Sequence, residues 1–113
     1  MPQRTDQGWA FGEYPGCIPD TVNGYSHLRD LYFATDPDYA DRFTVPVLWD
    51  KQQSVVVNNE SSEIIRMFNS AFDEHTDEEI DYYPDRLRSE IDEINDFVYE
   101  RVNNGVYRAG FAT

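Results

Sequence analysis

Two short runs rich in β-branched residues place the strongest constraint on how this chain can fold. Residues 43–49 (FTVPVLW) and 54–57 (SVVV) flank a polar stretch at 50–53. This pattern predicts an antiparallel β-hairpin. A two-stranded hairpin is only marginally stable alone and needs further strands or packing partners. We therefore expect the segments on either side of it to supply those partners.

The segment before the hairpin is expected to begin as a loop and to end as a helix. Residues 1–24 contain several glycines and prolines and no sustained apolar period, which is typical of irregular structure. Apolar side chains at helical spacing then predict a helix over residues 25–35. The dipeptide Asp36-Pro37 is expected to stop it, because the residue before a proline disfavours helical geometry.

After the hairpin, a second helix is predicted to run to about Phe72, with Asn59 and Ser61 as candidate N-terminal caps. Residues 73–83 (DEHTDEEIDYY) form an acidic connector, which is a plausible domain boundary.

The remainder predicts a long amphipathic helix that begins near Pro84, a residue suited to a first helical turn. Asn104-Gly105 is expected to end this helix. Its recurring apolar positions are Leu87, Ile91, Ile94, Val98 and Val102.

The order of these elements favours an α/β fold. A helix, a β-hairpin and a covering helix correspond to the second half of a thioredoxin-type unit and do not make a complete one. The long helix also has an apolar stripe with few candidate partners to cover it. We therefore expect a fragment of a larger fold, divided into residues 1–72, a linker at 73–83 and a helical region at 84–113.

The charge balance excludes some classes of partner. Acidic residues number 22 against nine basic ones, which gives a net charge of -13. Such a field repels phosphate backbones, so we expect no nucleic-acid partner. Only Lys51 among the basic residues is a lysine. Abundant acid with little lysine suggests a halophilic protein, although an ordinary acidic protein is the alternative.

Location and metal binding are constrained by what the sequence lacks. No apolar run approaches the roughly 20 residues that span a bilayer, and the first residues lack the hydrophobic core of a signal peptide. Cys17 is the single cysteine, so neither an internal disulfide nor a cysteine-based zinc site is expected. We expect a cytoplasmic protein without a metal or membrane partner.

Two short motifs could bind a ligand. A cis Val45-Pro46 bond would turn the Val45 backbone outward to pair with an extended peptide, but cis bonds are only about 5–6% of X-Pro bonds in folded proteins, and an edge-strand start is the alternative. At the second motif, Glu60 could pair with an ammonium, while Ser61 and free helix N–H groups take a carboxylate. Such a helix mouth would suit a γ-glutamyl head group; simple helix capping is the alternative.

Several segments together resemble one family. VPVLWD, NNESSEIIRMFNSAF, EIDEIN and NNGVYRAGFAT are similar to segments of the Xi-class glutathione transferases, the glutathionyl-hydroquinone reductases. The resemblance covers essentially the whole chain. It implies a thioredoxin-like N-terminal domain followed by an all-helical C-terminal domain, usually in a homodimer. It also implies reductive deglutathionylation: a cysteine attacks the sulfur of a glutathionyl-hydroquinone, the hydroquinone leaves, and a second glutathione regenerates the enzyme.

The resemblance assigns roles to particular residues. It implies that the Val45 backbone holds the cysteinyl part of glutathione beside cis Pro46, and that Glu60 and Ser61 bind the γ-glutamyl head. Two aromatic residues would complete the site. They are Trp9, which would stack beside the tripeptide, and Tyr107, which would reach the quinone site.

The sequence departs from the family at the nucleophile. The family's cysteine lies in a Cys-Pro-Trp-Ala motif, where a helix N-terminus favours the thiolate, and these 113 residues contain no such motif. Cys17, in a Gly/Pro-rich segment, is interpreted as a bystander. We therefore expect thiol binding without turnover, for glutathione or γ-glutamylcysteine; a non-catalytic interaction module and a gene remnant are the alternatives.

Overall fold

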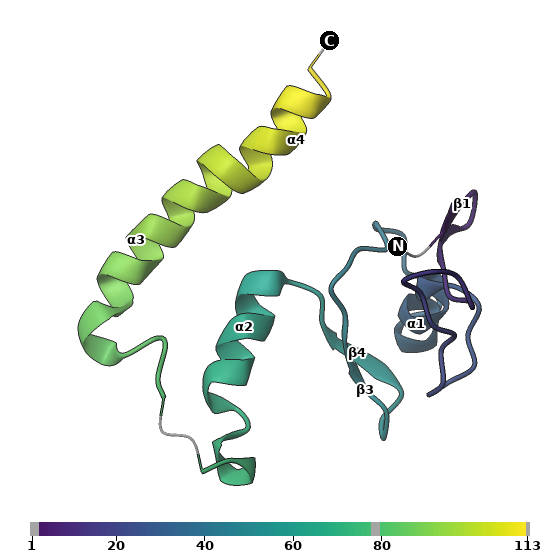
Figure 1. The fold of residues 1–113 in the computed structure, drawn as a ribbon, viewed down its shortest axis with the longest axis horizontal. Helices are drawn as coiled ribbons and strands as arrows, with labels where there is room; N and C mark the ends of the chain where they lie inside the picture. The colour runs from purple at the N-terminus through teal and green to yellow at the C-terminus, as the bar shows by residue number, and fades with distance from the viewer. Residues whose placement is uncertain (1–2, 78–79, 113) are drawn as a thin grey trace. The chain divides into compact units, whose positions relative to one another are not determined.

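The fold is described by a computed structural model, which covers residues 3–77 and 80–112 (Figure 1). It groups into two compact units, Met1–Ile65 and Arg66–Thr113, and each is described by itself. The elements of the first unit are β1 (Gln3–Thr5), β2 (Gly8–Ala10), α1 (Leu28–Thr35), β3 (Leu48–Asp50), β4 (Val55–Asn58) and the start of α2 (Ser61–Ser70). Those of the second are the rest of α2, then η1 (Asp73–His75), η2 (Asp85–Leu87), α3 (Arg88–Val98), η3 (Tyr99–Asn103) and α4 (Asn104–Gly110).

The central hairpin is confirmed. Strands β3 and β4 pair antiparallel, and Figure 1 shows them as neighbouring arrows. The turn is held by Asp50, whose carboxylate accepts the backbone N–H groups of Gln53 at 2.9 Å and Gln52 at 2.8 Å. Those two bonds lower the pKa of the Asp50 carboxyl. The four-residue polar stretch therefore closes the hairpin through one aspartate side chain.

The first strand of this hairpin is shorter than the sequence predicts. It begins at Leu48 and not at residue 43. Pro46 has no N–H to donate to a ladder, and the Thr44 carbonyl is already occupied, since it accepts the Tyr32 hydroxyl at 2.8 Å. Residues 44–46 therefore form a bend that is fixed by a side chain.

Helix α1 carries the core of the first unit. Leu28, Leu31 and Tyr32 are buried on its inner face, and Tyr32 is 3% exposed. Its end at Asp36 is as predicted, although it starts at Leu28 and not at residue 25. The side chains packed against this core are Trp9, Phe11, Tyr25, Tyr39, Phe43, Val47, Trp49 and Val56.

A threonine links α1 to the β3–β4 hairpin. The Thr35 hydroxyl donates to the Leu31 carbonyl at 3.0 Å and accepts the Val56 backbone N–H at 2.7 Å. Strand β4 thus donates a backbone N–H to a side chain of the helix, in addition to its pairing with β3. The hairpin is therefore packed against a helix and is not an isolated pair.

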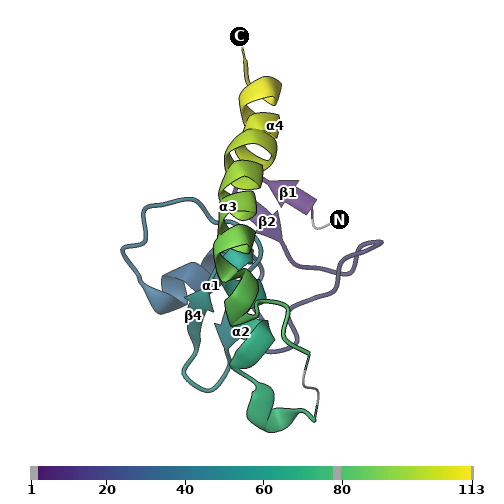
Figure 2. The same ribbon diagram turned by 90° about the vertical axis from the view of Figure 1, so that its left-hand side faces the viewer.

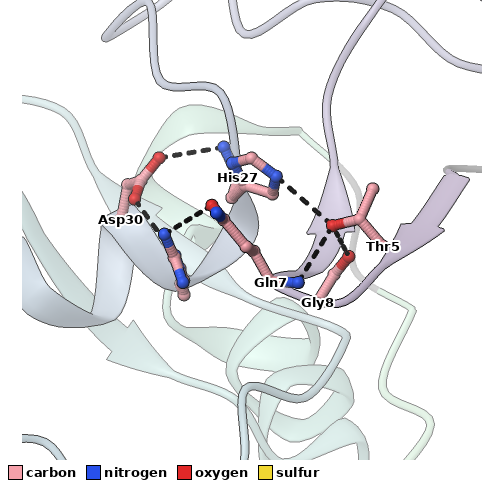
Figure 3. A network of polar contacts seen from close by, with 6 residues as sticks. Thr5, Gln7, Gly8, His27 and Asp30 are labelled. Atoms are coloured by element: carbon pink, nitrogen blue, oxygen red, sulfur yellow. Dashed lines mark hydrogen bonds and ion pairs between the residues drawn. The ribbon is translucent and has the colours of Figure 1, made fainter.

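The expectation of a continuous loop over residues 1–24 is wrong at its start, because β1 and β2 form a small antiparallel hairpin. Thr5 closes its turn: its hydroxyl accepts the Gln7 N–H at 3.2 Å and donates to the Gly8 carbonyl at 3.1 Å (Figure 3). Gly8 has a φ of 96°, a conformation that glycine adopts without strain. Strands of three residues are too short to show an alternating apolar pattern.

The same hairpin is tied to the start of α1. The Thr5 hydroxyl lies 3.4 Å from Nε2 of His27, and the His27 backbone N–H donates to Asp30 at 2.9 Å (Figure 3). Arg29 donates to the Gln7 side chain at 2.7 Å. These contacts hold the turn between β1 and β2 against the first turn of α1.

The second unit is organised around α3, and its long helix continues further than predicted. Asn104-Gly105 does not end it: a π-helical segment, η3, carries the chain into α4 as far as Gly110. Figure 2 shows α3, η3 and α4 following one another as a single coil. Gly105 remains helical because the backbone bonds continue through it. Within residues 3–77 and 80–112, no helix is both long and apolar enough to cross a membrane.

A polar cluster joins the second half of α2 to α3. Arg66 donates to Asp92 at 2.7 Å, and its guanidinium lies 3.8 Å from the centre of the Tyr83 ring. The Tyr83 hydroxyl lies 2.7 Å and 2.6 Å from the two carboxylate oxygens of Asp92. This cluster fixes the end of the acidic connector to both helices.

Candidate functional site

The bend before β3 contains the first pair of candidate ligand residues. The Val45–Pro46 peptide bond is cis, as the resemblance implied. Val45 is 59% exposed. The residue therefore lies at the surface of the first unit.

The N-terminus of α2 contains the second pair. Glu60 accepts the first helical bond, from the Ile64 N–H at 2.9 Å, and Ser61 is the first residue of α2. Both side chains are exposed. Within the part of the chain that the structure describes, neither the Glu60 carboxylate nor the Ser61 hydroxyl has a hydrogen-bond partner. These groups are therefore free to bind a solute at the positive end of the helix dipole.

The two asparagines before Glu60 have different roles. The Asn58 side-chain oxygen accepts the Glu60 N–H at 2.7 Å, which closes a tight turn at the helix entrance. Asn59 was expected to cap the helix, and this is wrong. Its amide points away from the helix and donates to the Tyr32 hydroxyl at 3.2 Å and to the Thr44 hydroxyl at 3.1 Å.

These bonds bring the two candidate motifs together. Thr44 precedes Val45 in the chain, and Asn59 precedes Glu60. The Tyr32 hydroxyl donates to the Thr44 carbonyl while it accepts from Asn59. The structure therefore connects the cis-proline bend to the mouth of α2 through one buried hydroxyl.

A cleft of about 290 Å³ lies beside this connection. Glu60, Asn59 and Tyr32 line part of it, with Thr35, Tyr39 and residues of β4. Burial, followed by the charges of Tyr32 and Asp41, raises the pKa of Tyr39. The Tyr39 hydroxyl donates to the Arg42 carbonyl at 3.1 Å.

The remaining candidate residues take no part in these hydrogen bonds. Trp9 is half-buried on β2 against the core, and Tyr107 is 68% exposed on α4 of the second unit. Cys17 is half-buried, with its sulfur 3.8 Å from the Ala10 carbonyl oxygen and 3.6 Å from that of Ile18. Over residues 3–77 and 80–112, no three His, Cys, Asp or Glu side chains gather as metal ligands would.

Sequence reasoning missed Tyr32, Thr44 and the true role of Asn59. Tyr32 was recognised only as an apolar position of a helix, and its hydroxyl contacts residues 12 and 27 positions away. The one signal in the sequence was the doubled asparagine, because a helix start needs only one such cap.

Comparisons with known proteins identify relatives along nearly the whole chain. It is 51% identical over 113 residues to glutathionyl-hydroquinone reductase YqjG of Escherichia coli, covering 99% of this chain and 34% of the relative. It is 53% identical over 110 residues to glutathione S-transferase omega-like 2 of Schizosaccharomyces pombe, covering 94% of this chain and 35% of the relative. No protein-family model matches the chain.

Solved structures share its fold. The glutathione S-transferase Xi of Phanerochaete chrysosporium superposes with a TM-score of 0.93 at 52% identity, over 99% of this chain and 40% of that one. The glutathione-bound structure of YqjG gives 0.92 at 51% identity, over 99% and 37%. The chain therefore spans about a third of the length of the curated relatives it matches.

Proposed function

We propose that this chain, which is 51% identical to about a third of a glutathionyl-hydroquinone reductase and superposes on a Xi-class structure, forms the thiol-binding part of such an enzyme. The observation that carries this proposal is the pair of side chains at the mouth of α2, the Glu60 carboxylate and the Ser61 hydroxyl, which have no hydrogen-bond partner within the described residues.

The ligand contacts follow from the chemistry of the two motifs. Ser61 and the free N–H groups of α2 bind the α-carboxylate of a γ-glutamyl group, and Glu60 pairs with its ammonium. The Val45 backbone, beside Pro46, pairs with the cysteinyl residue. These contacts use only the γ-Glu-Cys portion, so they serve glutathione and γ-glutamylcysteine alike. Trp9 stacks beside the ligand, and Tyr107 contributes to the quinone site.

The reaction is the one implied by the resemblance. The thiolate of the family's cysteine attacks the sulfur of the conjugate, the hydroquinone leaves with a proton, and a second glutathione releases glutathione disulfide. The 113 residues contain no Cys-Pro-Trp-Ala motif, so by themselves they bind the thiol ligand without turning it over. This proposal includes the division of the chain into residues 1–72, 73–83 and 84–113. It also includes a homodimer, a cytoplasmic location and the lack of a nucleic-acid partner.

Isothermal titration of the folded chain with glutathione and with γ-glutamylcysteine tests the binding. Ser61→Ala should weaken both affinities about tenfold, because a hydrogen bond to a charged carboxylate is lost. Ser62→Ala, one residue further along the same helix, is the matched control and should bind as the unmodified chain does. A folded chain that binds neither thiol in molar KCl would overturn the proposal.

A further inference from the structure

We propose that Asn59 is a positioning residue for thiol binding: it sets the distance between the part of the site that holds the cysteinyl residue and the part that holds the γ-glutamyl head. The inference rests on the proposed function and adds residues to the site that neither the sequence motifs nor the ligand chemistry assigns.

The hydrogen-bond geometry supports this role. The Asn59 amide has two N–H donors, and each has one acceptor: the Tyr32 hydroxyl at 3.2 Å and the Thr44 hydroxyl at 3.1 Å. The Tyr32 hydroxyl in turn donates to the Thr44 carbonyl at 2.8 Å. The three residues therefore form a closed ring of hydrogen bonds in which both side-chain N–H donors of Asn59 are used.

This ring of hydrogen bonds lies directly beside the two candidate ligand motifs. It joins residues 44 and 59, which lie 15 positions apart, at the residues directly before Val45 and Glu60. Both of these neighbours are exposed, and Val45 is 59% exposed. Packing by their own side chains therefore does little to hold them in place.

Tyr32 fixes the ring to the core. It is 3% exposed on the inner face of α1, and its ring lies 4.8 Å from that of Tyr39 and 5.6 Å from that of Phe43. A buried hydroxyl at the end of a packed ring has little freedom to move, and leaving it without partners is costly. The bend and the helix mouth are therefore both held in place by hydrogen bonds to the Tyr32 hydroxyl.

The consequence for binding is specific to ligands that touch both motifs. A ligand that reaches from the helix mouth to the bend gains affinity when the two are already at the right separation. A ligand that touches only the helix mouth gains nothing from the link. γ-Glutamylcysteine is of the first kind, and L-glutamine, which has the same α-amino-acid head and ends in an amide, is of the second.

The test compares these two ligands by NMR titration of the full chain and its variants. Asn59→Ala removes both amide bonds, of which the bond to Thr44 links the two motifs. It should weaken γ-glutamylcysteine binding about five- to tenfold and leave L-glutamine binding within about twofold. Thr44→Val should reproduce that effect, and Thr44→Ser, which keeps the hydroxyl, should restore near-normal binding. The double variant Asn59→Ala/Thr44→Val should bind no more weakly than Asn59→Ala, because the bond between residues 59 and 44 can be lost only once.

Three other outcomes would contradict the proposed role of Asn59. Equal weakening of both ligands by Asn59→Ala would make Asn59 a support of the helix start alone and overturn the link. Unchanged γ-glutamylcysteine affinity in Asn59→Ala would also overturn it, with the proposed function left intact. A folded, unmodified chain that binds neither ligand would overturn the proposed function and this inference together. Circular dichroism of each variant at the titration temperature shows that it is folded.

Discussion

The hydroxyl of Tyr83 bridges both carboxylate oxygens of Asp92, at 2.7 Å and 2.6 Å. Tyr83 lies at the end of the acidic connector and Asp92 lies on α3, so the contact fastens the connector to the helix. Arg66 completes it from α2, with its guanidinium over the Tyr83 ring and one nitrogen on the same carboxylate.

Removal of the Tyr83 hydroxyl should destabilise the second unit. Tyr83→Phe keeps the ring under Arg66 but leaves Asp92 without one of its donors, so the midpoint of urea unfolding should fall. Tyr82→Phe is the matched control, because Tyr82 is 77% exposed and its side chain makes no such bond within the described residues. Equal midpoints for the two variants would contradict this account.

Acid should weaken the same contact. Donation from the Tyr83 hydroxyl, then from Arg66, lowers the pKa of the Asp92 carboxyl below its ordinary value. As pH falls, the Asp92 carboxylate is therefore protonated in the unfolded chain before it is protonated in the folded chain. The contribution of Asp92 to stability is present above the ordinary carboxyl pKa and is lost as pH falls through the lowered pKa of the folded chain. The stability difference between the unmodified chain and Asp92→Asn should be largest near about pH 6 and shrink in strong acid.

Asp96→Asn, on the same helix, is the control for that measurement and should show no such loss of difference with acid. Urea unfolding followed by circular dichroism across the pH range gives both comparisons. A difference for Asp92→Asn that grows with acid would reverse the assigned sign.

The link between α1 and β4 should depend on one hydroxyl. Thr35→Val removes the acceptor of the Val56 N–H, which lies 2.7 Å away, and should cost about 1 kcal/mol of unfolding free energy. Thr35→Ser retains that acceptor and should cost markedly less. Exchange of the Val56 amide hydrogen should accelerate in the valine variant alone, and equal protection in both would show that the hydroxyl is not the partner that matters.

Salt should stabilise the chain. Its net charge is -13, and raising KCl from about 0.1 M to about 1 M shortens the screening length from about 10 Å to about 3 Å, which weakens repulsion among exposed carboxylates. The thermal midpoint should therefore rise with KCl. In the double variant Glu93→Gln/Asp96→Asn it should rise less steeply, because two of the repelling carboxylates are removed. Greater stability at low salt would exclude the halophilic interpretation.

Cys17 should have no part in the chemistry. Its sulfur faces two backbone carbonyls, of Ala10 and Ile18, and Cys17→Ser should leave the affinity for glutathione unchanged. The chain alone should not turn over glutathionyl-menadiol. Measurable turnover that disappears in Cys17→Ser would make this cysteine the nucleophile.

The sequence predicted those elements whose signals are local. The β3–β4 hairpin follows from two β-branched runs around an aspartate, and the end of α1 follows from Asp36-Pro37. The β1–β2 hairpin was missed because three-residue strands show no periodicity. The extension of the last helix was missed because Asn104-Gly105 usually ends a helix, and only the surrounding backbone bonds decide that it does not here.

The candidate site divides in the same way. The helix start at Ser61 could be predicted, because capping residues beside an apolar period are a local signal. The role of Asn59 could not, since its partners are 15 and 27 residues away and nothing in the adjacent residues distinguishes it from Asn58. Long-range hydrogen bonds of this kind become visible only when the fold brings α1, the bend and α2 together.

The π-helical segment η3 also fixes which way the end of the chain faces. A single π turn takes up one residue more than an α-helical turn would, so it changes the angular phase of everything that follows. Deletion of one residue between 99 and 103 would restore ordinary helical winding and rotate α4, with Tyr107, by about 100° about the helix axis relative to Ile91 on α3. The direction in which Tyr107 points is therefore set by a single inserted residue.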